Sequence, residues 1–205
     1  MYKIILASNS PRRKELLAGL DVPFEVKVIK GIDESYPESL DAYQVAEFIC
    51  KKKAEAYRSI FDEGETCEGQ ELLVLTADTV VIAPTADEQN DQEGKGVILG
   101  KPKDAADARR MLQMLSGKTH HVVTGVCLTT RDKQHSFSVA TEVTFKDFTA
   151  EEIDYYIEHY RPFDKAGAYG IQEWIGYVGC TGLKGSYFNV MGLPVQRIYE
   201  ELKKL

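Results

Sequence analysis

The first candidate for chemistry is the run Ser8-Asn9-Ser10-Pro11-Arg12-Arg13, which follows directly on an apolar stretch. Ser10 and Pro11 predict a helix start, because serine caps helices well and proline suits the first helical position. Unpaired backbone N–H groups and the positive end of the helix dipole attract anions at such a start. Cationic side chains there oppose the dipole, so Arg12 and Arg13 favour a bound anion such as a phosphate. A capped surface helix with solvated arginines is the alternative interpretation.

A second candidate is the acid in Thr76-Ala77-Asp78-Thr79, which ends another apolar run. A carboxylate near the interior of a sheet must be paired, hydrogen-bonded or bound to a metal. Asp78 can therefore hold Mg²⁺ or activate a water beside a phosphate. An aspartate in a turn, or in a structural ion pair, explains the same pattern equally well.

The glycine-rich segment 164–172 is the third candidate. Gly167 and Gly170 allow a close backbone approach or a positive φ angle. Lys165 can serve as a point charge for a phosphate. Gln172 offers a donor and an acceptor together, which suits the amide edge of uracil or thymine. The spacing alone does not distinguish this segment from an ordinary loop.

Four further charged side chains can support these groups. Lys53 and Lys101 are candidate phosphate-binding cations, and Asp33 and Glu34 form a pair of adjacent carboxylates that can join a metal site. Taken alone, each of the four is more often a solvated surface residue.

Several other chemistries are not supported by their motifs. His120 and His121 are adjacent on a predicted strand and face opposite sides, so they do not chelate one metal and are interpreted as structural. The chain shows no GxSxG, P-loop or GxGxxG motif. Its cysteines form no CxxC pair and are expected to be buried thiols rather than zinc ligands or disulfides: Cys50, Cys67, Cys127 and Cys180.

Composition excludes further classes of function. The chain has 205 residues, is 43% hydrophobic and carries a net charge of −7, which argues against a nucleic acid polymer as partner. A local cluster of cations still suffices for a small anion. No apolar run approaches the roughly 18 residues that span a membrane. The first residues do not resemble a signal peptide, so we expect a cytoplasmic protein without a membrane partner.

These candidates must be positioned by strands and helices that alternate along the chain. Apolar patterns predict strands at 3–7, 24–30, 72–82, 97–99, 120–130 and 136–147, the last two as an antiparallel pair. Helices are predicted from Ser10-Pro11 to about Leu20, and at 41–61, 104–115 and 150–159, with a last one starting at Pro194. Residues 84–96 form an acidic hairpin excursion or insert, and 164–189 is expected to be irregular to β. The fold class is α/β with a long mixed sheet, flanking helices and two lobes around a central cleft, in a single domain over residues 1–205.

Taken together, these motifs resemble the Maf family. The resemblance runs from about residue 3 to residue 200 and rests on Ser8–Arg13, Lys53-Ala54, Ala77-Asp78-Thr79, Gly100-Lys101-Pro102, Leu115–His120, Asp164–Gln172 and Met191–Pro194. It implies a fold related to the inosine triphosphatases (Maf/Ham1-type). It also implies a nucleoside triphosphate pyrophosphatase that uses a divalent metal such as Mg²⁺ or Mn²⁺ and forms a homodimer. One departure is the segment 84–96, which is longer than the turn usual in the family.

The resemblance also assigns roles to individual residues. It implies that Asp78 is the general base, and we expect Asp78 and Glu34 to be metal ligands. The specificity positions fall on Arg12, Thr79 and Gln172, which resemble the subgroup that acts on dTTP and UTP. Phosphate-handling positions fall on Ser8, Arg13, Lys53, Lys101 and Lys165. A nucleotide-sensing regulator of septum formation, with little turnover, is the alternative function.

Overall fold

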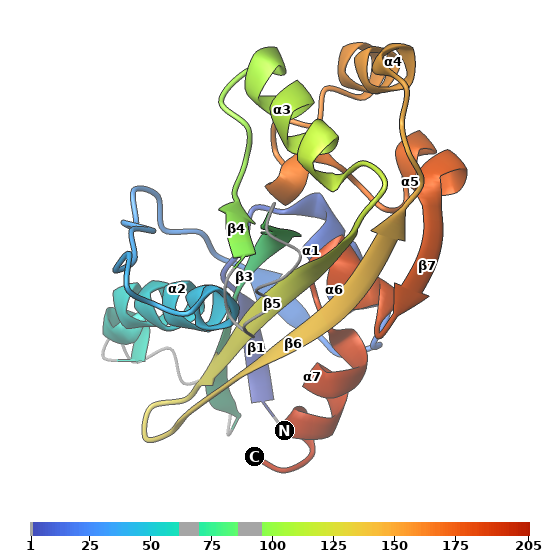
Figure 1. Cartoon of the computed structure of the whole chain (residues 1–205). Coiled ribbons are helices and arrows are strands. Elements are labelled where there is room, and N and C mark those ends of the chain that lie inside the picture. Colours follow the sequence, from blue (N-terminus) through green and yellow to red (C-terminus); the bar gives the residue numbers. More distant parts are fainter. Residues whose placement is uncertain (1, 62–69, 86–95) are drawn as a thin grey trace.

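The computed structural model describes residues 2–61, 70–85 and 96–205 (Figure 1). Its centre is a seven-stranded sheet in the order β2-β1-β3-β5-β6-β7, with β4 also paired to β3. The strands are β1 (Tyr2–Leu6), β2 (Phe24–Val26), β3 (Glu71–Pro84), β4 (Gly96–Leu99), β5 (Thr119–Thr129), β6 (Gln134–Phe145) and β7 (Cys180–Lys184). Strand β1 runs parallel to β2 and β3, and the other pairs are antiparallel, which confirms the predicted mixed sheet.

Strand β3 has a split edge that opens the sheet. Its first part pairs with β1 up to Leu75, and its last part pairs with β4 from Val81 onward. On that edge, the described residues place no strand against 76–80, whereas β5 covers the opposite edge from Val74 to Ile82. Asp78 and Thr79 therefore lie in a gap between two partner strands. In this gap, side chains rather than a neighbouring backbone must provide hydrogen bonds to the backbone groups of β3.

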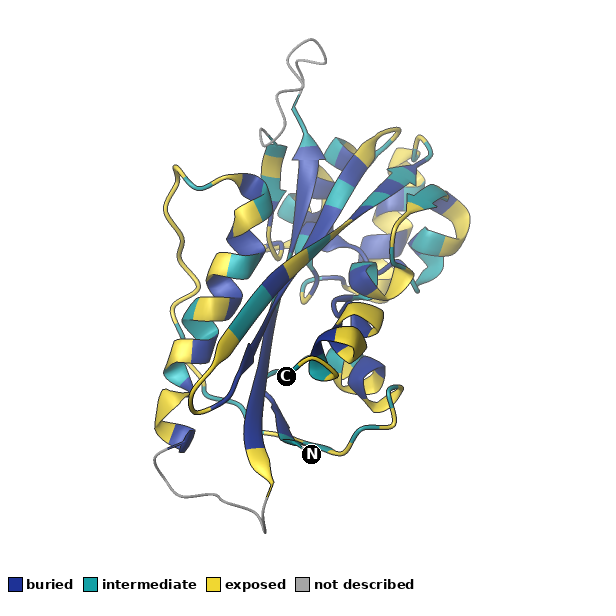
Figure 2. Ribbon diagram, turned by 90° about the horizontal axis from the view of Figure 1, so that it is seen from below, coloured by how far each residue is buried: buried dark blue, intermediate teal, exposed yellow. Residues whose placement is uncertain are grey.

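Helices cover both faces of the sheet. The described helices are α1 (Pro11–Ala18), α2 (Ala42–Ala56), α3 (Ala105–Leu115), α4 (Ala150–Tyr160), α5 (Trp174–Gly179), α6 (Tyr187–Met191) and α7 (Val195–Leu202), with 3₁₀ turns η1 (Arg58–Phe61) and η2 (Ala166–Ala168). Helices α3 and α4 lie at one end of the sheet, and α7 lies near both termini (Figure 1). The strands β1, β3 and β5 are largely buried, whereas β2 and β7 contain only half-buried or exposed residues, and the outward sides of the helices are exposed (Figure 2).

The alternation of side chains along β3 assigns each face its partners. Leu73 and Leu75 pack with Leu17 of α1 and Ile198 of α7. Val80 and Ile82 face the other way and pack with Val45 and Ile49 of α2. Asp78 lies on the α2 face and Thr79 on the α1 face, so the gap in the strand edge is bordered from both sides.

Local signals predicted several boundaries correctly. Ser10 caps α1 and accepts a hydrogen bond from the backbone N–H of Arg13 at 3.4 Å. His120 is buried and its Nε2 pairs with the Tyr169 hydroxyl at 2.7 Å, so its structural role is confirmed. Cys50 and Cys127 are buried free thiols, and Cys180 is a half-buried one. Cys67 lies outside the described residues, as do residues 86–95 of the predicted insert.

Four predicted elements differ in the structure. The strand predicted at 24–30 ends at Val26, because the Tyr57 hydroxyl bonds Ile29 N and Lys27 O in place of a partner strand. The helix predicted at 41–61 ends at Ala56 and is followed by η1, and the first helix ends at Ala18 rather than near residue 20. The prediction of irregular to β structure at 164–189 was wrong in part, because this segment contains α5 and α6 as well as β7.

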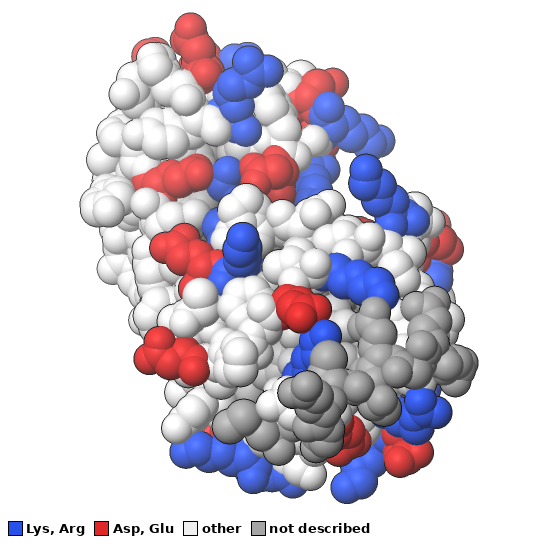
Figure 3. Space-filling view, turned by 180° about the vertical axis from the view of Figure 1, so that it is seen from behind, with Lys and Arg blue, Asp and Glu red and all other residues white. Residues whose placement is uncertain are grey.

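The described part of the chain contains no helix that is both long and apolar enough to cross a membrane. On the face shown in Figure 3, the described Lys and Arg side chains are interspersed with Asp and Glu. The cations that matter for a small anion must therefore be sought locally.

Candidate active site

One cavity of about 740 Å³ collects the predicted site residues. It lies where β3 is uncovered between β1 and β4, and residues from both faces of the sheet line it. Except for Asp33, the candidate site residues are among its lining residues: Ser8, Arg12, Arg13, Glu34, Lys53, Asp78, Thr79, Lys101, Lys165 and Gln172. Residues from six separate parts of the sequence thus share one space.

On the α2 side of the cavity, Lys53 links two carboxylates. Its Nζ lies 2.7 Å from Asp78 Oδ1 and 3.0 Å from Glu34 Oε1. Asp33, the neighbour of Glu34, turns away and pairs with Lys52 at 2.6 Å. Only Glu34 of the predicted pair therefore reaches the cavity. There the carboxylates of Glu34 and Asp78 converge on Lys53 Nζ, and carboxylate oxygens are hard ligands.

On the opposite side, Arg13 connects the helix start to β3. Its Nη1 donates to Ala77 O at 2.7 Å, its Nη2 to Thr79 Oγ1 at 3.0 Å and its Nε to Gly192 O at 2.8 Å. Burial lowers the pKa of this guanidinium, although the charge of Asp78 raises it. The bond to Ala77 O supplies a donor that a neighbouring strand would otherwise provide in the gap, and the three bonds together use three of the five N–H groups of Arg13.

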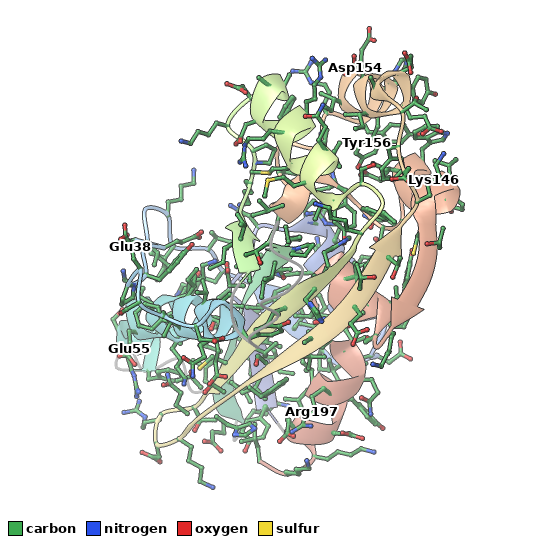
Figure 4. The ribbon with its side chains drawn as sticks, in the orientation of Figure 1. Glu38, Glu55, Lys146, Asp154, Tyr156 and Arg197 are labelled. Carbon is green, nitrogen blue, oxygen red and sulfur yellow. The ribbon has the colours of Figure 1, made fainter. Side chains whose placement is uncertain are left out.

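A chain of ion pairs closes the third side. Arg12 Nη1 lies 2.8 Å from Asp164 Oδ2, and Lys165 Nζ lies 2.8 Å from Asp164 Oδ1 and 3.0 Å from Glu173 Oε1. Although partial burial raises it, hydrogen bonds from Lys165 and Arg12 lower the pKa of Asp164 to about 2. The Tyr156 hydroxyl of α4, labelled in Figure 4, donates a hydrogen bond to Glu173 and so links these ion pairs to the end of the molecule where α3 and α4 lie.

Two cavity residues keep polar atoms without protein partners. Gln172 Oε1 is buried and has no hydrogen-bond partner among the described residues. Lys101 is exposed, and in the described ranges its ammonium has no ion-pair or hydrogen-bond partner. A buried amide oxygen without a partner costs free energy, so it marks a position where a ligand donor is favoured.

Comparison with known proteins agrees with the motifs. The model of the Maf family, described as Maf-like protein, matches residues 3–205. This chain belongs to the Maf family.

The relatives of this Maf-family chain are similar over their full lengths. A dTTP/UTP pyrophosphatase of Phocaeicola vulgatus is 57% identical over 204 residues, which cover 100% of this chain and 96% of that protein. A dTTP/UTP pyrophosphatase of Bacteroides thetaiotaomicron is 50% identical with the same coverage. A solved dITP/XTP pyrophosphatase of Mycobacterium abscessus shares 12% identity at a TM-score of 0.43, covering 99% of this chain and 95% of that one.

Sequence reasoning missed some residues that shape this Maf-family site. Asp164 lies within a quoted motif, but its pairing with Arg12 joins residues 152 positions apart, and no local pattern indicates it. Two more residues were missed: Thr124, which contacts Thr79 directly, and Asn189, which contacts it through Thr124. The polar Thr124 inside the apolar run of β5 was the one local signal of a buried polar partner.

Proposed function

We propose that this protein is a nucleoside triphosphate pyrophosphatase that hydrolyses dTTP and UTP to the monophosphate and pyrophosphate. The observation that carries the proposal is the cavity, where Asp78 stands among cations from α1, α2 and the loop after β4. The activity in the names of relatives at 50% and 57% identity over the whole chain supports the same reaction.

The reaction begins with a water positioned by Asp78. Asp78 accepts a proton as the water oxygen attacks the α-phosphorus, and the bond from that phosphorus to the oxygen bridging to the β-phosphorus breaks. Pyrophosphate leaves with the bridging oxygen, and the new P–O bond completes the monophosphate. Charge develops on the phosphate oxygens, so cations held in place before the reaction should supply the main catalytic effect. Arg12, Lys53 and Lys101 are the side chains we assign to this role.

A divalent metal fits the donor atoms of this site. The carboxylates of Asp78 and Glu34 lie close together, because both contact the ammonium of Lys53. Such hard oxygen ligands are what Mg²⁺ or Mn²⁺ requires. The described residues hold no cluster of three or more acidic, His or Cys side chains, so a metal here would take its remaining ligands from waters and phosphate oxygens. When bound, the metal would neutralise phosphate charge and polarise the α-phosphorus.

The base is assigned to Gln172, which lines the same cavity as Asp78. Gln172 Oε1 has no protein partner, so it can accept the imide N–H of uracil or thymine while its amide N–H₂ donates to a ring carbonyl. Arg12, Thr79 and Gln172 are the specificity residues under this proposal, and Ser8, Arg13 and Lys165 border the phosphates.

The test is pyrophosphate release from a panel of nucleoside triphosphates with Mg²⁺. Release from dTTP and UTP at rates well above those for CTP and GTP is the expected result. Binding of nucleotides without pyrophosphate release would instead support the alternative, a nucleotide-sensing regulator of septum formation. We further propose that the enzyme acts in the cytoplasm and as a homodimer, which fractionation and light scattering would test.

A further inference from the structure

The hydroxyl of Thr79 lies in a fixed hydrogen-bond chain behind the cavity wall. Thr79 and Thr124 are directly opposite each other in the β3–β5 ladder, and their Oγ1 atoms are 2.9 Å apart. Thr124 Oγ1 lies 3.2 Å from the backbone carbonyl of Asn189, and Arg13 Nη2 lies 3.0 Å from Thr79 Oγ1. Thr79 borders the cavity, whereas Thr124 is fully buried behind it.

The direction of each hydrogen bond in this chain follows from counting protons. A carbonyl oxygen only accepts, so the single hydroxyl proton of Thr124 goes to Asn189 O. Thr124 must then accept the hydrogen bond from Thr79, so the single hydroxyl proton of Thr79 is used in that bond. A guanidinium only donates, so Arg13 occupies one lone pair of the Thr79 oxygen. What Thr79 still offers to the cavity is one lone pair and no proton.

The hydrogen-bond chain returns to Arg13 through Gly192, and this ring stabilises the direction of each bond. Gly192 N donates to Asn189 O at 2.9 Å, and Gly192 O accepts from Arg13 Nε at 2.8 Å. The Asn189 side chain is anchored by bonds of 3.0 Å to Val122 O and to Thr141 Oγ1. If the Thr124 proton turned toward Thr79, the oxygens of Thr124 and Asn189 would face each other at 3.2 Å with no proton between them, which is unfavourable in a protein interior.

An acceptor without a proton selects among the parts of a nucleotide. Ionised phosphate oxygens are acceptors, so this hydroxyl has nothing to donate to them. The base or the sugar must supply a donor. Gln172, with its free Oε1, lines the same cavity and favours the base. Uracil and thymine carry a single proton on N3, which the Thr79 lone pair shares with Gln172 Oε1, whereas N3 of cytosine is an acceptor and would face both oxygens unfavourably.

We propose that Thr124 is a positioning residue that, through Asn189, fixes Thr79 as a pure acceptor and so favours bases with an N3 proton. This inference rests on the proposed function and deepens its base selection. Thr124 touches no substrate, and its effect passes entirely through the orientation of the Thr79 hydroxyl.

The experiment compares wild type with Thr124→Val, which keeps the shape and removes the acceptor for the Thr79 proton. The freed hydroxyl can then turn its proton toward N3 of cytosine. We expect the UTP/CTP ratio of kcat/KM to fall roughly tenfold in this variant. Thr124→Ser, which keeps the hydroxyl, should restore the ratio. Thr129→Val makes the same change in a buried threonine of β5 outside the cavity lining and should leave the ratio at the wild-type value.

Binding measured without turnover separates this inference from the proposed function. Dissociation constants for UTP, CTP and dUTP, taken by calorimetry in EDTA, should show the same loss of selectivity even if no pyrophosphate is released. An unchanged UTP/CTP ratio in Thr124→Val overturns the inference. An equal loss of affinity for UTP and CTP also overturns the inference. A change confined to the ratio of UTP to dUTP does so too, because it would place the sugar rather than the base at Thr79. Thr124→Cys, with a weak acceptor of similar size, replaces the valine variant if the latter does not fold.

Discussion

The ammonium of Lys53 and the carboxylate of Asp78 face each other at 2.7 Å across the wall between α2 and β3. Their side chains are only 14% and 13% exposed, so water screens this pair less than it screens a surface ion pair. The arrangement places a positive and a negative group side by side at the cavity. A phosphate can bind the first group, and a water can bind the second.

Asp78→Asn keeps the shape of the side chain and removes its basicity. If Asp78 is the general base, kcat for dTTP should fall by roughly 10²–10⁴-fold. The melting temperature should change little, because the variant leaves the packing intact. Asp154→Asn is the control, since Asp154 lies on α4 (Figure 4), pairs with Arg109 and does not line the cavity. Near-normal turnover by Asp78→Asn would remove this residue from the proton transfer.

Lys53→Gln tests the phosphate assignment. The loss of a charged hydrogen bond should lower kcat/KM roughly ten- to hundredfold. The factor should be equal for dTTP and UTP, because a phosphate contact carries no information about the base. Lys52→Gln is a matched control, since the adjacent Lys52 pairs with Asp33 outside the cavity. If base preference changes while the total rate persists, Lys53 does not act on the phosphates.

The metal proposal makes a prediction about Glu34. EDTA should abolish pyrophosphate release, and Mg²⁺ should restore it. Glu34→Gln removes one hard ligand charge, so the Mg²⁺ concentration for half-maximal activity should rise severalfold while the saturated rate stays closer to normal. Glu38→Gln is the control, because Glu38 (Figure 4) is exposed and lies outside the cavity lining. An identical Mg²⁺ requirement in Glu34→Gln and wild type would exclude Glu34 as a ligand.

Gln172→Ala addresses the base. Because its unpartnered Oε1 suits an imide N–H, the variant should lose roughly 5- to 150-fold in kcat/KM for UTP and dTTP and less for CTP. The preference for pyrimidines with an N3 proton should flatten, and the metal requirement should persist. Measuring UTP, dTTP, CTP and GTP with wild type and variant decides the matter. An unchanged ranking would place the base elsewhere in the cavity.

The sequence predicted those features that depend on neighbouring residues. The helix start at Ser10 and the acid that interrupts the apolar run at Asp78 are local patterns, and the structure places both at the cavity. The short helices α5 and α6 were missed because glycine-rich segments have low helix propensity and depend on tertiary packing. The bonds of Arg13 to Ala77 O and Gly192 O depend on the gap in β3, which no pattern along one strand indicates.

Buried His120 predicts how stability depends on pH. Burial, and to a lesser degree the charge of His121, lowers the pKa of His120 to about 3, against about 6.5 in the unfolded chain. Below pH 6.5 the unfolded state therefore binds a proton that the folded state does not, so acidification favours unfolding. The free energy of unfolding should fall by up to about 1.4 kcal/mol per pH unit between pH 6.5 and 5 from this residue. The pKa of Asp164, at about 2, lies well below that window.

His120→Gln should remove this slope, because the substituted side chain does not titrate. Its stability at pH 7 should be lower, since the bond to the Tyr169 hydroxyl and the contact with the Phe145 ring are altered. Urea unfolding at pH 7, 6 and 5 gives the slope for each protein. His121→Gln is the control, because the adjacent side chain projects to the other face of β5 and contacts the Tyr43 ring. Parallel pH profiles for wild type and His120→Gln would mean that His120 takes up its proton without unfolding.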